Sequence, residues 1–290
     1  MTAANQQDVQ SRAAKTLSSE PRPFLRWAGS KRALLSRFVD VLPHDFGRYW
    51  EPFLGAGSLF FLLEPKDAVL NDSCGPLIET YIAVRYRVDL VLRYLAPLHV
   101  DKETYYDIRR HPGESPFRRA AEFIYLNKAG WNGLYRVNSK GQFNVPYGAP
   151  KSDVVVDRSN LRACSSALAQ PGVALGSADF EVAIANAEAG DLVFLDPPYV
   201  TGHNNNGFID YNEVLFSWTD QLRLAAVAIK LANKGVNVVV TNAHHQPVID
   251  LYKGFQVRRI NRASTLAGAA ARRGRVDEAL FWKTRNGSGL

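Results

Sequence analysis

Cysteine and methionine are scarce in this 290-residue chain, which has two cysteines, Cys74 and Cys164, and a single methionine. Two cysteines are too few for a disulfide framework, and these two lack the paired spacing of a zinc site. The six histidines show no H-E-x-x-H or comparable ligand spacing. We therefore predict two buried or inert thiols and no bound metal.

Long apolar runs are also missing. No stretch approaches the roughly 18 uncharged apolar residues that cross a membrane, and the first twenty residues lack the apolar run of a signal peptide. Residues 1–22 are polar and lead into Pro21-Arg22-Pro23, so we expect a flexible leader. With 46% hydrophobic residues available for a core, these features favour a soluble, cytoplasmic protein.

Positive charge is in excess, with a formal net charge of +7. Arginines cluster at separate places rather than in one tail, namely at Arg109-Arg110, Arg118-Arg119, Arg258-Arg259 and Arg272-Arg273. Such patches suit contacts along a phosphate backbone, and they suit solvated helix faces as well. The charge raises the expectation of a polyanionic partner without identifying one.

Short apolar segments alternate with helical patterns along most of the chain. We expect strands at 49–53, 68–71, 172–176, 191–195 and 236–241, with helices near 178–186 and 219–233. This alternation predicts an α/β fold with a parallel sheet. The last two apolar runs, 254–260 and 279–284, predict a closing antiparallel pair around segment 261–276.

Between residues 76 and 166 the apolar positions are spaced by three and four, which is typical of helices. A polar stretch inside this block contains Asn138-Ser139-Lys140-Gly141, which predicts a hairpin or loop tip. We predict that 76–166 form an inserted, mainly helical subdomain. Residues 23–75 and 167–285 would form the main domain, followed by a tail at 286–290.

The tetrapeptide Asp196-Pro197-Pro198-Tyr199 follows an apolar, strand-like run. Its carboxylate can accept a hydrogen bond from an NH2 group, its prolines offer carbonyls without N–H donors, and its tyrosine offers a stacking face. The set suits a planar amine. A stiff turn that ends a strand would explain Asp-Pro-Pro equally well.

Two further motifs suit a nucleotide-like cofactor. Residues 51–58, Glu-Pro-Phe-Leu-Gly-Ala-Gly-Ser, stand where the first strand should end, and their glycines would let a ligand approach the backbone and a helix N-terminus. Phe60 occupies the third glycine position of the nicotinamide fingerprint, which disfavours a dehydrogenase. Asp72 ends the next strand-like run and can accept hydrogen bonds from ribose hydroxyls, a role compatible with capping a helix before Gly75.

A third motif, residues 24–31, places Trp27 and Lys31 around a glycine turn. The lysine could neutralise the carboxylate of a cofactor that carries an amino acid, and the tryptophan could pack against its aliphatic part. In isolation, Ser30 would be an ordinary helix N-cap and Trp27 an ordinary core aromatic.

Taken in order, these motifs resemble those of the Dam-type DNA adenine methyltransferases. The likeness covers about residues 24–284 and includes 125–136, Tyr-Leu-Asn-Lys-Ala-Gly-Trp-Asn-Gly-Leu-Tyr-Arg, and 141–148, Gly-Gln-Phe-Asn-Val-Pro-Tyr-Gly. The resemblance implies a Rossmann-like methyltransferase domain, S-adenosylmethionine as methyl donor, and an inserted target-recognition subdomain that contacts double-stranded DNA. It also implies a nucleoid-associated protein and leaves a cognate restriction enzyme open as a partner.

The resemblance implies roles position by position. Donor contacts would come from Trp27, Lys31, Glu51, Gly55, Gly57, Asp72, Asp179, Phe180 and Asp196. DNA contacts would come from Trp131, Asn132, Leu134, Arg136, Lys140 and Pro146. The catalytic residues would be Asp196, Pro197, Pro198 and Tyr199. The chain departs from the family at Trp131, where a smaller aromatic is common, and at Gly130, where the family often carries a side chain.

The reaction expected from the resemblance is direct methyl transfer to the N6 amine of an adenine flipped out of duplex DNA. The Asp196 side chain and the Pro197 carbonyl would hold the amine, and Tyr199 would stack on the base. Two alternatives stay open: a methyltransferase acting on exocyclic amines of RNA, and a catalytically silent DNA-binding module.

Overall fold

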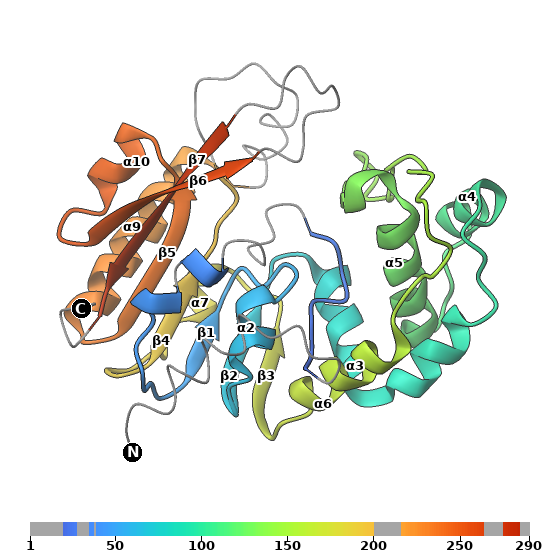
Figure 1. Ribbon diagram of the computed structural model, residues 1–290, viewed down its shortest axis with the longest axis horizontal. Helices are drawn as coiled ribbons and strands as arrows, with labels where there is room; N and C mark the ends of the chain where they lie inside the picture. The colour runs from blue at the N-terminus through green and yellow to red at the C-terminus, as the bar shows by residue number, and fades with distance from the viewer. Residues whose placement is uncertain (1–19, 28–34, 38, 200–215, 264–274, 285–290) are drawn as a thin grey trace. The chain divides into compact units, whose positions relative to one another are not determined.

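The computed structural model describes residues 20–27, 35–37, 39–199, 216–263 and 275–284 (Figure 1). The predictions for Ser30 and Lys31, and for most of segment 261–276, lie outside these residues. No helix in the described ranges is long and apolar enough to cross a membrane. In the same ranges, no group of three or more His, Cys, Asp or Glu side chains could hold a metal ion.

Seven strands form one mixed sheet in the order β3-β2-β1-β4-β5-β7-β6. They are β1 (Tyr49–Glu51), β2 (Asp67–Asn71), β3 (Gly172–Gly176), β4 (Leu192–Leu195), β5 (Asn237–Ala243), β6 (Gln256–Ala263) and β7 (Arg275–Lys283). β4 is parallel to β1 and β5, and β2 is parallel to β3, whereas β7 is antiparallel to β5 and β6. The α/β fold with a parallel sheet and a closing antiparallel pair is therefore confirmed.

Helices connect most of the strands. The α-helices are α2 (Ser58–Leu63), α3 (Gly75–Leu95), α4 (Lys102–Arg110), α5 (Pro116–Ala129), α6 (Arg158–Leu168), α7 (Phe180–Ala183), α9 (Trp218–Asn233) and α10 (Gln246–Leu251). The described residues also form the 3-10 helices η1 (Leu35–Arg37), η2 (Val39–Val41) and η3 (Trp131–Gly133). The helix expected at 178–186 is only one turn long, because Asp179 caps its start and the backbone leaves helical geometry at Ile184.

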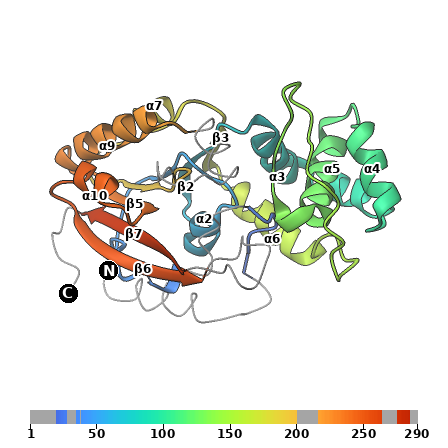
Figure 2. The same ribbon diagram turned by 90° about the horizontal axis from the view of Figure 1, so that it is seen from above.

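The chain divides into two compact units, and the described part of the first comprises 35–53 and 179–284 with their gaps. β4 and β5 are buried at every position, as expected for central parallel strands. α9 packs on β5 (Figure 1), and a capping box between Ser217 and Asp220 fixes its first turn. β7 lies between β5 and β6, as Figure 2 also shows.

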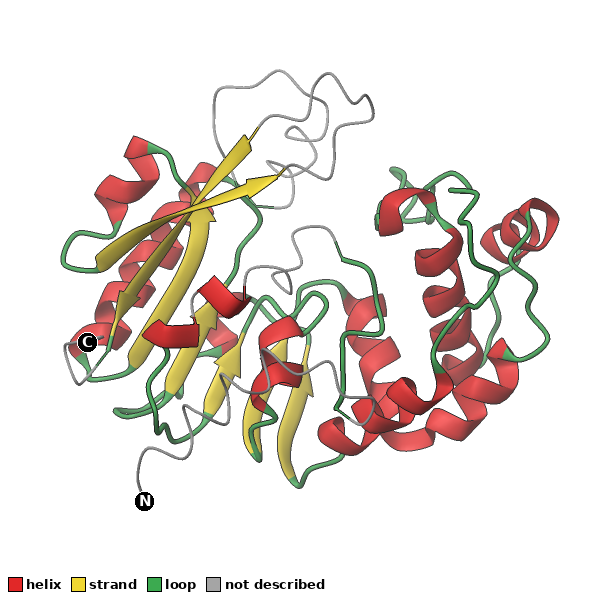
Figure 3. Cartoon of the chain, viewed as in Figure 1, coloured by secondary structure: helices red, strands yellow, loops and turns green. Residues whose placement is uncertain are grey.

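The described part of the second unit comprises 20–27 and 54–178. Its helices, red in Figure 3, are centred on α3, which packs against α5 and α6. α3 buries Leu77, Tyr81, Val84 and Val91, a spacing of three, four and seven that matches the expected apolar stripe. The unit boundaries fall at 53/54 and 178/179, and the recognition subdomain expected at 76–166 stays a prediction.

Candidate active site and nucleic-acid interface

The Asp-Pro-Pro-Tyr segment begins directly after β4, within the first unit. Asp196 is half-buried, and its Oδ1 accepts a hydrogen bond of 2.6 Å from the hydroxyl of Thr241. Leu195 is in register with Val240 of the parallel strand β5, so Asp196, the first residue after β4, lies beside Thr241 of β5. The carboxyl edge of a parallel sheet is where ligands of such folds bind. The segment therefore lies where a site is expected.

The hydroxyl of Tyr199 lies close to two carboxylates, those of Glu278 and Asp196. The hydroxyl donates to Oε2 of the buried Glu278 on β7 at 3.0 Å, and it lies 3.5 Å from Oδ1 of Asp196. Burial, together with the negative charges of Asp196 and Glu278, raises the pKa of Tyr199 well above its ordinary value. Tyr199 is consequently a neutral hydrogen-bond donor throughout the neutral pH range.

Glu51 ends β1, the strand that pairs with β4. It is 3% exposed, and its Oε2 accepts a 2.9 Å hydrogen bond from the hydroxyl of Tyr49. Burial and then Glu51 raise the pKa of Tyr49, with a smaller contribution from Asp196. Two predicted site residues, Glu51 and Asp196, are thus close enough to act on one tyrosine.

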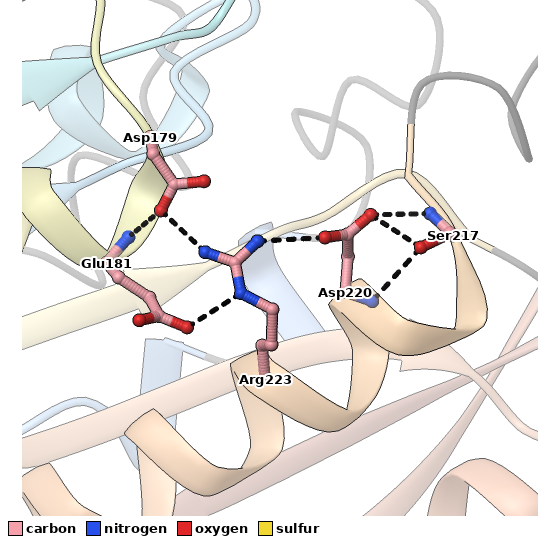
Figure 4. Close-up of polar contacts among 5 residues, drawn as sticks. All are labelled: Asp179, Glu181, Ser217, Asp220 and Arg223. Carbon is pink, nitrogen blue, oxygen red and sulfur yellow. Dashed lines mark hydrogen bonds and ion pairs between the residues drawn. The ribbon is translucent and has the colours of Figure 1, made fainter.

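Arg223 organises the start of α7, as Figure 4 shows. Its guanidinium donates to Asp179, Glu181 and Asp220 at 3.0, 3.0 and 2.9 Å. It also lies 4.8 Å from the centre of the Phe180 ring. Asp179 additionally caps α7 by accepting from the Glu181 N–H. The predicted pair Asp179-Phe180 is therefore fixed by one arginine from α9.

Three aromatic rings meet beside this pair. The ring centre of Phe180 lies 5.5 Å from Phe53 and 5.9 Å from Phe216, and those two lie 5.6 Å apart. Phe180 and Phe216 are buried, and Phe53 is half-buried. An aromatic wall next to an exposed carboxylate suits a flat base with an amino group.

In the second unit, the glycine motif is tied to Asp72. Gly55 and Gly57 have φ of 47° and 64°, in the left-handed region that favours glycine. The Gly55 N–H donates to Asp72 Oδ2 at 2.9 Å, and the Cys74 N–H donates to Oδ1 at 3.0 Å. Burial outweighs these two hydrogen bonds and raises the pKa of Asp72. The N-cap of α3 is Cys74, so the capping role considered for Asp72 is wrong.

Trp27 packs closely over the same loop. A Cβ atom on Gly55 would lie 2.8 Å from Cδ1 of Trp27, so only glycine allows this approach. The Trp27 ring also stacks on Tyr135 and Phe123, with ring centres 5.8 and 6.3 Å away. Trp27, a predicted donor contact, and Tyr135 of the run 125–136 therefore share one aromatic stack.

The loop that follows α5 presents the predicted DNA-contacting residues. The Trp131 N–H donates to the Pro146 carbonyl at 2.9 Å, so these two residues lie side by side. Asn132 has φ of 53°, and the Trp131 side chain remains 48% exposed. Asn132 and Pro146 are exposed as well, whereas Leu134 is half-buried.

Arg136 and Lys140 lie on the hairpin tip, and both are exposed. A bridge between Val137 and Phe143 closes the tip, and the Asn138 side chain accepts from the Lys140 N–H at 3.0 Å. This confirms the expected hairpin or loop tip. Arg136 Nε donates to Oδ1 of Asn144 at 2.8 Å, and this hydrogen bond orients the guanidinium.

Asn127 joins two predicted functional segments, a role that the sequence does not reveal. Its Oδ1 accepts from the Arg26 N–H at 2.8 Å, and its Nδ2 donates to the carbonyls of Arg26 and Gly133 at 2.6 and 3.1 Å. Asn127 is 4% exposed. Burial and the charge of Arg26 lower the pKa of the neighbouring Lys128.

Comparison with known proteins agrees with this geometry. The family of D12 class N6 adenine-specific DNA methyltransferases matches residues 27–266, and the chain belongs to that family. The type II methyltransferase M1.LlaDCHI of Lactococcus lactis subsp. cremoris is 36% identical over 267 residues, covering 89% of this chain and 94% of that protein. The type II methyltransferase M.MjaIII of Methanocaldococcus jannaschii is 34% identical, covering 83% and 91%. The DNA adenine methylase of Escherichia coli K12 is 31% identical, covering 89% and 94%.

The family identifies the chain as an enzyme, an adenine-specific DNA methyltransferase. The family match confirms the resemblance to DNA adenine methyltransferases that the sequence motifs indicated. Neither the family match nor the relatives assign a role to any single residue of this chain.

Proposed function

We propose that the enzyme transfers a methyl group from S-adenosylmethionine to the N6 amine of an adenine flipped out of duplex DNA. The observation that carries this proposal is the cluster at the carboxyl end of β4. There, Asp196 is oriented by the Thr241 hydroxyl, and Pro197 and Pro198 add carbonyls with no N–H. An amine is the group that such an acceptor-rich site would hold.

The residues present fit the proposed donor. Each Asp72 oxygen accepts one backbone N–H and retains a lone pair for a ribose hydroxyl. The rings of Phe53, Phe180 and Phe216 suit the donor's adenine, with Asp179 for its amino group. We further assign Trp27, Lys31, Glu51, Gly55 and Gly57 to donor binding. When bound, the donor supplies an electrophilic methyl group on a sulfonium.

The protein's own contribution is positioning and electrostatics. The Asp196 carboxylate and the Pro197 carbonyl accept the two N6 hydrogens, which directs the nitrogen lone pair toward the methyl group. The Tyr199 ring stacks on the flipped base. Flipping is required because a stacked adenine hides N6, and no covalent enzyme intermediate is needed.

We propose that residues 76–166 form the target-recognition subdomain. Its exposed residues at η3 and the hairpin, Trp131, Asn132, Arg136, Lys140 and Pro146, would contact DNA, and Leu134 would fill the gap left by the flipped base. The charges of Arg136 and Lys140, both exposed on this hairpin, support a phosphate partner there. Phosphate contacts would position the enzyme, while few side chains read bases.

Arg136 is the residue proposed to read a guanine. Replacing Arg136 with Ala should relax the preference at one base position by roughly 1 to 3 kcal/mol. Lys140→Ala is the matched control on the same hairpin, and it should weaken methylation of all sequences alike. The measurement is competitive methylation of a library with a randomised site. Equal losses across all sequences for Arg136→Ala would assign this arginine to phosphate contacts instead.

Arg223 should matter for donor affinity, because it holds Asp179 and covers Phe180. Arg223→Leu is expected to raise the dissociation constant of S-adenosylhomocysteine by roughly 3- to 10-fold, the range expected for exposed ion pairs in a network. Arg258→Leu is the matched control. Arg258 is also 39% exposed, pairs with Asp40 and lies 5.3 Å from the Trp282 ring centre. Titration calorimetry should show a change only for Arg223→Leu.

The proposed function is tested by tritium transfer from labelled S-adenosylmethionine. Unmethylated duplex DNA should be labelled, and its digest should contain N6-methyladenine. Labelling of RNA in preference to DNA would favour the RNA methyltransferase, and no labelling of either would favour a silent DNA-binding module. We place the enzyme at the nucleoid in the cytoplasm. Its similarity to two type II methyltransferases supports a search for a cognate restriction enzyme.

A further inference from the structure

Glu278 is a buried carboxylate to which the proposed reaction gives no role. It lies on β7, paired in register with Ala243 of β5 and Ile260 of β6, and it is 3% exposed. A carboxylate in this position is costly to bury unless hydrogen bonds satisfy it. One of its hydrogen bonds comes from Tyr199, whose hydroxyl donates to Oε2 at 3.0 Å. Glu278 therefore touches the segment that is proposed to hold the target base.

The Tyr199 hydroxyl has two acidic neighbours and a single proton. It lies 3.0 Å from Glu278 Oε2 and 3.5 Å from Asp196 Oδ1. Hydrogen bonds between oxygens are favourable near 2.7 to 2.8 Å and weaken with distance, so the proton belongs on the side of Glu278. The pKa of Tyr199 is raised well above its ordinary value, so this proton stays on the tyrosine.

Asp196 already accepts from the Thr241 hydroxyl at 2.6 Å through the same Oδ1. A second hydrogen bond, donated to Asp196 by the Tyr199 hydroxyl, would draw negative charge away from the carboxylate. A carboxylate with less available charge is a weaker acceptor for an amine, because charge-assisted hydrogen bonds are the stronger ones. The acceptor strength of Asp196 thus depends on where the Tyr199 proton points.

We propose that Glu278 is a positioning residue of the methyl-transfer reaction, which accepts the hydrogen bond of the Tyr199 hydroxyl and so keeps Asp196 available as the acceptor of the target amine. The proposal rests on the proposed role of Asp196. It differs from a simple anchoring role, in which Glu278 would only fix the Tyr199 ring. The two roles predict rate losses of different size when the hydroxyl is removed: a small loss for the proposed role and a large loss for anchoring.

The test measures single-turnover transfer from tritiated S-adenosylmethionine to unmethylated genomic DNA, using the full-length enzyme. Glu278→Leu should lower the rate by roughly 10-fold or more, the size of a lost hydrogen bond to a charged group, because the Tyr199 hydroxyl then turns to Asp196. Tyr199→Phe keeps the ring and should lose less than about 5-fold. The double variant Tyr199→Phe/Glu278→Leu should recover to the level of Tyr199→Phe, because the competing proton is gone.

Recovery in the double variant supports the proposal, whereas a double variant as slow as Glu278→Leu overturns it. Asp277→Ala is the control on the neighbouring position of β7, where the carboxylate pairs with Arg259, and it should leave the rate unchanged. If circular dichroism shows that Glu278→Leu does not fold, the decision rests on Tyr199→Phe. A rate loss above about 5-fold shows anchoring and overturns the proposal, and a smaller loss supports it.

The same assay separates this inference from the proposed function. If Asp196→Ala transfers methyl groups as fast as the unchanged enzyme, the amine-holding role of Asp196 fails, and the inference fails with it. If Asp196→Ala is inactive and the double variant does not recover, only the role of Glu278 is wrong.

Discussion

Asp196→Ala is expected to lower the single-turnover rate of methyl transfer by roughly 10²- to 10³-fold, the usual effect of removing one preorganised polar group from a reaction centre. Binding of S-adenosylhomocysteine and of DNA should remain measurable, because other side chains are proposed to carry most of that binding. The physical reason is that an amine with no acceptor keeps its lone pair conjugated with the ring, where it does not attack a methyl group.

Asp191 provides a matched control at the other end of β4. Its buried carboxylate accepts from the Trp50 indole N–H and the Arg48 N–H, both at 2.8 Å. Asp191→Ala should lower the free energy of unfolding by about 1 to 3 kcal/mol while the rate per folded molecule is kept. Asp196→Ala should instead lower the transfer rate and leave the free energy of unfolding nearly unchanged. Equal transfer rates for Asp196→Ala and the unchanged enzyme would contradict the amine-holding role.

Asn127→Ala is expected to produce the largest loss of stability, about 2 to 4 kcal/mol in the free energy of unfolding. The buried amide makes three hydrogen bonds, and its loss leaves the Arg26 N–H and two carbonyls without this partner. Trp27, proposed to bind the donor, follows Arg26, and residues proposed to contact DNA flank Gly133. We therefore also expect higher KM values for both the methyl donor and DNA.

Asn138→Ala is the matched control for Asn127→Ala. Asn138 is exposed at the hairpin tip, where its side chain accepts from the N–H groups of Lys140 and Gln142 at 3.0 Å. Its removal should cost no more than about 1 kcal/mol, because water can replace these bonds. Urea denaturation of both variants measures the difference. The clamp role of Asn127 is refuted if the two variants lose equal stability.

The sequence predicts well those features that local residues determine. The strand before Asp196 is apolar at four consecutive positions, and the polar residue that follows it must lie at the carboxyl edge of a parallel sheet. Gly55 and Gly57 mark a tight turn for the same local reason, and both have positive φ. The hairpin tip at Asn138 follows from its turn residues.

The partners of these residues could not be predicted in this way. Thr241 is 45 positions from Asp196, and Glu278 is 79 positions from Tyr199. Only the register of β5 and β7 brings them to the same edge, and register depends on the whole sheet. Asn127 lies inside a recognised motif, yet its function depends on Arg26, which is 101 positions away.

Asp72 shows how a distant partner overrides a local preference. An aspartate shortly before a Gly-Pro helix start is a reasonable candidate for an N-cap. Oδ2 of Asp72 instead accepts a hydrogen bond from the Gly55 N–H, 17 positions earlier in the chain. Cys74 becomes the N-cap, without a side-chain hydrogen bond, and Asp72 connects the glycine loop to the end of β2.

Single-molecule sequencing of DNA from cells that express the enzyme tests the central claim most directly, because it reports both the modified base and its sequence context. The host should lack adenine methylation of its own, and Asp196→Ala should be expressed in parallel. We predict N6-methyladenine at one recurring sequence with the unchanged enzyme and none with Asp196→Ala. Equal adenine methylation by the two proteins would contradict the account, as would modification of a base other than adenine.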